Sequence, residues 1–141
     1  MAARLGPRVL VQGMAPRGVE LVLGRVRDAD FGAIVVAGAG GELVEVLADA
    51  AFALPPFGPA TALRLVEGLR LAPLLVGVRG RPPVDCAALA GAVACFSGLA
   101  HALGDAIAEL DVNPVIAGPR GTIAVDALVR PATASTPSAR A

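Results

Sequence analysis

The 141-residue sequence contains no lysine, because all twelve of its basic residues are arginines. Any mechanism that needs a lysine amine is therefore excluded for this chain. Twelve acidic residues balance the arginines, so the formal net charge is zero. We expect neither a basic surface for nucleic acid nor an acidic tail for a cationic partner. Charge alone identifies no partner.

Cysteine and histidine are also scarce. Cys86 and Cys95 have no CxxC spacing and no matching pair of histidines, so we expect buried, reduced thiols rather than a disulfide or a metal site. The lone histidine, His101, lies inside an alanine-rich segment. We expect it to be a packed or partly exposed helix residue and not a carrier of phosphate.

Long apolar runs of the targeting kind are missing as well. The N-terminal stretch "MAARLGPRVLVQ" lacks the apolar core of a secretory signal. One segment of 19 residues, "CAALAGAVACFSGLAHALG", is long enough to cross a membrane. However, Leu89, Val93, Phe96, Ala100 and Leu103 fall on one helical stripe, which is typical of a buried helix in a soluble protein. We therefore expect a cytoplasmic protein without a membrane span.

Hydrophobic residues make up 55% of the chain, which is ample for the core of one domain. The segment 42–57 fits a helix or a strand, and its flanking glycines and prolines favour extended structure. We expect no helix within 71–83, which is rich in proline and glycine. The expected strands are 8–14, 18–26, 32–38, 106–116 and 122–129, and the expected helices cover 59–70 and begin near Val84, with Asp85 in the first turn.

These elements predict an α+β fold rather than a run of βαβ units. We expect residues 1–7 to be a lead-in, residues 8–129 to be the folded unit, and residues 130–141 to be a disordered tail. The tail contains mainly small and polar residues and two prolines.

The stretch "AIVVAGAGGELVEVL" looks like the strand, glycine loop and helix of a dinucleotide site. The spacing fails, because Leu43 occupies the position of the third glycine and no acid lies near position 58 to bind a ribose. Two interpretations remain for Gly40 and Gly41. They form a tight turn, or, as we favour, their backbone N–H groups approach phosphate oxygens.

The stretch "ELDVNPVIAGPRGTIAVD" reads as a hairpin closed by "GPRG". If Pro119 and Arg120 are the two central residues of the turn, Asn113 lies opposite Asp126, with Cβ atoms about 5 Å apart. Asp111 then points to the same side of the strand. Three oxygen-bearing side chains on one patch suit Mg²⁺, which keeps water or phosphate as its other ligands. The alternative is an exposed polar face of a hairpin.

Three stretches together carry a family resemblance: "VLVQGMAPRGVELVLGRVRDADFGAIVVAGAGGELVEVLADAAFAL", "GVRGRPP" and "AELDVNP…VD". They resemble the C-terminal half of the ATP-grasp domain of NDP-forming acyl-CoA synthetases. This group includes ADP-forming acetate–CoA ligase and the β subunit of succinyl-CoA synthetase. The resemblance covers about residues 8 to 129. It implies an ATP-grasp subdomain, mainly an antiparallel sheet with two helices packed on it, that works with ATP or ADP, Mg²⁺ and, in the complete enzyme, CoA.

The resemblance also implies roles for single residues at the nucleotide end. Gln12, Gly13 and Met14 match the hinge that contacts adenine through its backbone. Glu20 is similar to a nucleotide-facing glutamate of the family. The roles of Arg79 and Arg81 stay open between contact with phosphate or CoA and a structural ion pair.

Further roles are implied at the phosphate end. Asn113 and Asp126 match the magnesium ligands. Asp111 matches an acidic position near the histidine that relays phosphate, and we take it as the catalytic candidate. A loop on the phosphate side is matched by Gly40, Gly41 and Glu45.

The sequence departs from the family by what it lacks. The N-terminal ATP-grasp half, with its phosphate-binding lysines, is absent, as are the CoA-binding and phosphohistidine domains. We therefore expect the ATP- and Mg-binding part of an acyl-CoA synthetase that is inactive alone and needs those domains from another chain. The alternative is a truncated, non-catalytic module for binding or oligomerisation.

Overall fold

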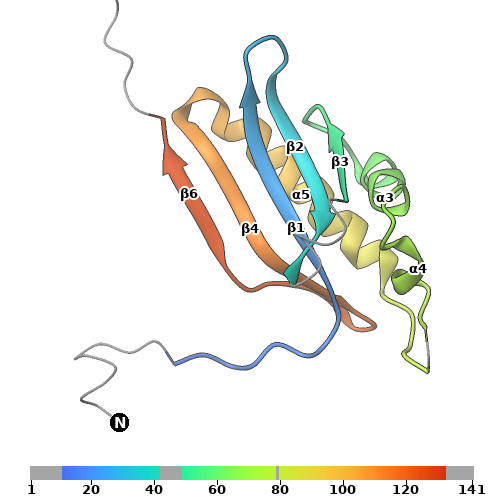
Figure 1. Ribbon diagram of the computed structural model, residues 1–141. Coiled ribbons are helices and arrows are strands. Elements are labelled where there is room, and N and C mark those ends of the chain that lie inside the picture. Colours follow the sequence, from blue (N-terminus) through green and yellow to red (C-terminus); the bar gives the residue numbers. More distant parts are fainter. Residues whose placement is uncertain (1–10, 42–48, 79, 133–141) are drawn as a thin grey trace, which may run out of the picture.

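The computed structural model describes residues 11–41, 49–78 and 80–132. They form an antiparallel sheet whose helices all lie on one side (Figure 1). The α+β prediction is thereby confirmed. In chain order the elements are β1 (Val19–Asp28), β2 (Gly32–Ala39), β3 (Ala50–Ala53), α3 (Pro59–Glu67), α4 (Ala72–Leu75), α5 (Cys86–Leu103), the 3-10 turn η2 (Gly104–Ala106), β4 (Ile107–Gly118), β5 (Gly121–Ala124) and β6 (Ala127–Pro131).

The strand β1 occupies the centre of the sheet. The order is β3-β2-β1-β4-β5, and β6 pairs with β4 along the same edge as β5. A short turn joins β1 to β2, and there the Asp28 carboxylate accepts the N–H groups of Asp30 (2.9 Å) and Phe31 (3.0 Å). An aspartate that bonds to the backbone two residues ahead is a common turn signal. These two bonds lower the pKa of Asp28.

The expected first strand, 8–14, is wrong for the residues that the structure describes. Residues 11–14 have no strand structure, and residues 8–10 lie outside the described part of the chain. The reason is that both edges of β1 are taken, one by β2 and the other by β4. An apolar stretch beside β1 in the sequence therefore has no edge of β1 left to pair with.

Two helices differ from expectation. The helix α3 begins at Pro59 as expected but ends at Glu67, where Gly68 follows. The segment expected to be free of helix contains the short helix α4, in which Pro73 lies in the first turn. Proline is tolerated there because the N–H groups of the first turn have no partner within the helix. The N–H group of Leu71, just before α4, is bonded to the Asp49 carboxylate at 3.1 Å.

The long helix α5 begins where the sequence predicts. Asp85 is its N-cap residue, one position before the first turn, and its side chain accepts the N–H group of Ala88 at 2.9 Å. Such a cap satisfies one of the free donors at a helix start. The N–H group of Asp85 in turn donates to the carbonyl of Gly118 at 3.0 Å, which fixes the helix start against the end of β4.

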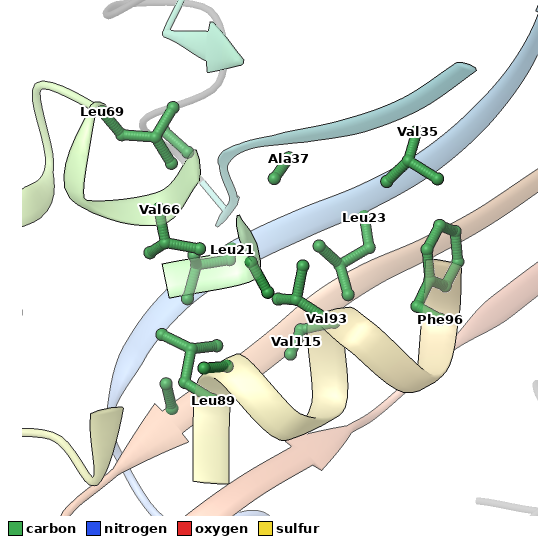
Figure 2. Packing of buried hydrophobic residues seen from close by; sticks show 14 of the residues in the cluster. Leu21, Leu23, Val35, Ala37, Val66, Leu69, Leu89, Val93, Phe96 and Val115 are labelled. Carbon is green, nitrogen blue, oxygen red and sulfur yellow. The ribbon is translucent and has the colours of Figure 1, made fainter. Parts of the chain in front are cut away.

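The core lies between α5, α3 and the covered face of the sheet. Leu89, Val93, Phe96 and Ala100 are buried, and Leu103 packs against them, so the predicted stripe of α5 is confirmed. Figure 2 shows three of these side chains directed at Leu21, Leu23 and Val115 of the sheet and Val35 and Ala37 beside them. Burial of such side chains contributes roughly 1.5–3 kcal/mol each.

The expectation that both cysteines are buried is wrong. Cys95 is exposed and Cys86 is half-buried, and both are free thiols. Cys95 lies two residues after Val93, and a step of two residues turns the helix about 200°, so it points away from the sheet.

In the described residues α5 with η2 is the one stretch that is long and apolar enough to cross a membrane. Core helices meet the same criterion.

A buried arginine links the sheet to the C-terminal end of α5. Arg25 of β1 is 1% exposed and has no carboxylate partner among the described residues. Its guanidinium donates instead to the carbonyls of Gly104 (2.6 Å), Ile107 (2.5 Å) and Ala108 (3.4 Å). The positive charge lies where the helix dipole leaves partial negative charge, which is favourable.

We expect Arg25→Met to lower the free energy of unfolding by about 2–4 kcal/mol, because one buried and two partly buried carbonyls lose a charged donor. Arg27→Met is the matched control on the same strand. Arg27 is 53% exposed and pairs with Asp105 at the surface, so its loss should cost less than about 1 kcal/mol. Urea unfolding of the two variants measures the difference, and equal losses would contradict the role given to Arg25.

Candidate functional site

The face of the sheet opposite α5 carries the residues predicted to bind nucleotide and metal. Large apolar side chains remain exposed on it, such as Phe52 at 64% and Leu128 at 59%. The pairing of β1 with β4 places Glu20 beside Ile116 and Gly24 beside Asp111. The two pairs are four residue steps apart on β1, which is about 13 Å along a strand. The open face therefore has two polar ends joined by an apolar floor.

The first polar end is a hollow of about 440 Å³ beside the start of β1. Gln12, Gly13, Met14 and Glu20 all line it, so four predicted nucleotide-binding residues come together. The first three belong to an exposed segment without helix or strand structure. Their backbone groups are thus not used up by a regular element.

Residues without a nucleotide-binding role predicted from the sequence also line this hollow. Ile116 and Val125 come from the hairpin, and Arg17 and Arg81 supply positive charge. Only the β1–β4 pairing reveals Ile116, and this pairing is not visible in a local sequence pattern. Arg81, whose role was left open, has no ion pair with the described residues. Arg79 lies outside the described residues.

The glycine loop lies at the same end of β1. Gly40 donates its N–H to the carbonyl of Glu20 at 2.9 Å. Gly41 has a φ of 61°, and a Cβ atom there would come within 2.0 Å of the Glu20 carboxylate. Both glycines, with Glu20 and Arg81, line a second hollow of about 600 Å³. Close packing on the Leu21 backbone accounts for Gly40, and close packing on Glu20 accounts for Gly41. Glu45 lies outside the described residues, and the phosphate role of the loop stays a prediction.

The hairpin has the predicted register. Val115 pairs with Ala124 and Gly118 with Gly121, and the same alignment continues into β6, where Val112 pairs with Ala127. Asn113 lies opposite Asp126, and its N–H group donates to the Asp126 carbonyl at 3.2 Å. Asp126 is one of two residues between β5 and β6. The hairpin thus brings the two predicted metal ligands to adjacent positions.

The carboxylates of this second polar end influence one another. Partial burial raises the pKa of Asp111 above its ordinary value, and the negative charges of Glu109 and Asp126 raise it further. Glu109 is paired with Arg130 across the hairpin. The Asp126 carboxylate accepts the N–H group of Ala127 at 2.8 Å. A cation placed among these groups would relieve the repulsion.

The donor set suits a hard cation that is only partly bound by protein. Asn113 offers an amide oxygen and Asp126 a carboxylate, the ligand types that Mg²⁺ prefers. The described residues contain no cluster of three or more His, Cys, Asp or Glu side chains that could hold a metal. Water and phosphate would therefore complete the coordination.

His101 lies away from this site. It is exposed near the C-terminal end of α5, the helix on the covered face, so the sheet separates it from Asp111. The expected start of the tail is wrong, because Arg130 and Pro131 belong to β6. Residues 133–141 lie outside the described part of the chain.

Comparisons with known proteins agree with this architecture. A family model described as an ATP-grasp domain matches residues 3–130. The β subunit of ADP-forming acetate–CoA ligase I from Pyrococcus furiosus is 39% identical over 119 residues, which are 84% of this chain and 51% of that subunit. Trans-feruloyl-CoA synthase FCS1, from an unknown prokaryotic organism, is 38% identical over 86% of this chain and 17% of its own length.

A solved structure shows the same fold. The acetyl-coenzyme A synthetase 1 of Ca. Korarchaeum cryptofilum, in complex with coenzyme A and Mg-AMPPCP, aligns with a TM-score of 0.76 and 39% identity. The alignment covers 83% of this chain and 55% of that one. The chain thus spans about half the length of the ligase subunit and a sixth of the longer synthase. It has the antiparallel subdomain fold of these neighbours, and it belongs to the ATP-grasp domain family.

Proposed function

We propose that this chain is the nucleotide- and magnesium-binding part of an acid–CoA ligase of the ADP-forming kind. The observation that carries the proposal is the arrangement of the open face. A hollow lined by the hinge and Glu20 lies at one end of β1, and Asp111 lies about 13 Å along the sheet, with Asn113 and Asp126 between the two. An extended nucleotide reaches from one to the other, with its base at the hinge and its phosphates at the acids.

Each group has a defined task in this proposal. The backbone of Gln12, Gly13 and Met14 binds the edge of adenine, and Glu20 accepts hydrogen bonds from the nucleotide. Asn113 and Asp126 hold Mg²⁺, which offsets the charge of the phosphates when it is bound. Asp111 lies beside them and orients a histidine of an added domain. This histidine receives the phosphoryl group from ATP or returns it to ADP.

The whole reaction interconverts acid, CoA and ATP with acyl-CoA, ADP and phosphate. This chain supplies half of the nucleotide site, since positioning a phosphoryl group and neutralising its charge need donors on both sides. The absence of lysine supports this division, because the complete site needs lysines on the phosphates from another polypeptide segment. CoA and acid bind to the added domains. The similar proteins include an acetate ligase and a feruloyl-CoA synthase, so the acyl group is set outside this chain.

The isolated chain should form no acyl-CoA from acid, CoA and ATP, because the second half of the site is missing. Activity should appear when the N-terminal half of the P. furiosus β subunit is joined before Arg8 and that ligase's remaining subunit is added. Loss of the free CoA thiol measures acyl-CoA formation by the isolated chain and by the joined enzyme. Acyl-CoA formation by the chain alone would contradict the proposal that it supplies half of the site. An inactive joined enzyme would favour a non-catalytic module.

The hinge prediction separates backbone from side chain. Gln12→Ala should change nucleotide affinity less than threefold, because the side chain is not the contact. Gly13→Pro should weaken it at least tenfold, since proline removes an N–H and fixes φ. Gly13→Ala is the matched control, because a Cβ there meets no atom within 4 Å. Calorimetric titration of the joined enzyme with ADP gives the three affinities, and equal losses for Gln12→Ala and Gly13→Pro would argue against a backbone hinge.

The metal prediction concerns two residues that act as one unit. Asp126→Asn and Asn113→Ala should each lower magnesium-dependent turnover of the joined enzyme at least tenfold, and the double variant should be little worse than either. Unfolding free energies should shift by no more than about 0.5 kcal/mol, since both side chains are exposed. Full activity of Asp126→Asn across a magnesium titration would show that the patch is only a polar face of a hairpin.

A further inference from the structure

One row of residues crosses the open face of the sheet from edge to edge. The strand registers align Phe52 of β3, Val36 of β2, Gly24 of β1, Asp111 of β4 and Leu128 of β6. Four of these residues carry side chains, and the central one carries none. The row therefore has a notch over β1, with Val36 on one side and the Asp111 carboxylate on the other.

The packing of the protein does not require a glycine in this notch. A Cβ atom on Gly24 would lie 3.7 Å from the Val36 Cβ and 3.9 Å from the Asp111 Oδ1, which are ordinary contacts. Gly38 in β2 is different, because a Cβ atom there would meet the Asp49 carbonyl oxygen at 2.6 Å. Gly38 is thus explained by the fold, and Gly24 is not.

The backbone does not require a glycine at position 24 either. Gly24 is not among the described glycines with a positive φ. The register between β1 and β4 shifts between Leu21 and Leu23, and Gly24 pairs regularly with Asp111 beyond that shift. A bulge or a left-handed conformation is therefore not the cause.

Gly24 makes the fold less stable than an alanine at this position would. A glycine inside a strand is destabilising by roughly 0.5–1 kcal/mol relative to alanine. A strand glycine that is not needed for a bulge or a bend marks a place where a ligand or another backbone approaches closely. The notch is open on the face that carries the predicted nucleotide site, so the space is kept for something bound there.

Building on the proposed function, we propose that the terminal phosphates of magnesium-bound ATP lie in the notch over Gly24. The Asp111 carboxylate forms one wall, and Asp111 lies two residues from the predicted magnesium ligand Asn113 on the same strand. The base lies four residues back along β1, in the hollow beside Glu20. Gly24 is then a positioning residue that lets the phosphates and their metal lie flat on the sheet.

The test compares two ligands on the 141-residue chain by NMR titration, which detects weak binding. Gly24→Ala should keep or raise the melting temperature. It should weaken binding of the magnesium complex of AMPPCP, a nonhydrolysable ATP analogue, at least tenfold and change adenosine binding less than twofold. The matched control is Gly91→Ala on α5, where an added Cβ meets no atom within 4 Å. This variant should leave the binding of both ligands unchanged.

Several results would overturn the assignment. The assignment would be wrong if Gly24→Ala bound the magnesium complex of AMPPCP as tightly as the wild type. It would also be wrong if the variant lost the same factor in affinity for AMPPCP and for adenosine. A lower melting temperature would show that the fold itself demands the glycine. A wild-type chain that binds neither ligand would instead refute the proposed function, and the notch assignment with it.

Discussion

Burial of one face of the sheet against α5 is the interaction on which the rest of this structure depends. The helix presents alanine, leucine, valine and phenylalanine to the central strands, and it carries no charged residue between its N-cap and His101. A helix of this kind can cover only one face. The other face is left open, and β1 and β4 therefore have a protected side for stability and a free side for function.

The buried Arg25 fits the same arrangement. An uncompensated cation in a core costs several kcal/mol unless its donors are satisfied. Here the C-terminal end of α5 and the start of β4 offer three carbonyls, while the guanidinium Nε atom has no hydrogen-bond partner among the described residues. The arginine thus fixes the helix end over β1 with polar contacts rather than with an ion pair.

Features that depend on neighbours in sequence were predictable. The turn at Pro119 and Arg120 determines the register of the last hairpin, and Asp85 marks the start of α5, because caps and turns act within a few residues. The strand order was not predictable in the same way. It places β1 between β2 and β4, and the pairing of Glu20 with Ile116 follows only from this long-range contact.

The same distinction applies to the candidate site. The hinge residues were predicted from the family resemblance, and the facing of Asn113 and Asp126 was predicted from the turn between them. Arg81 and Val125 could not be predicted, since loops distant in the sequence bring them to the hollow. The exposed Cys95 shows a further limit: in an alanine-rich helix the small residues do not mark clearly which side faces the core.

The last strand also bears on self-association through the edge of the sheet. β6 lies at an edge of the sheet, and its Leu128 and Val129 are more than half exposed, so its free backbone edge could recruit another strand and begin aggregation. Arg130, paired with Glu109, and Pro131, which has no N–H to donate, follow directly. Charge and proline at an edge are the means by which natural sheets discourage such pairing.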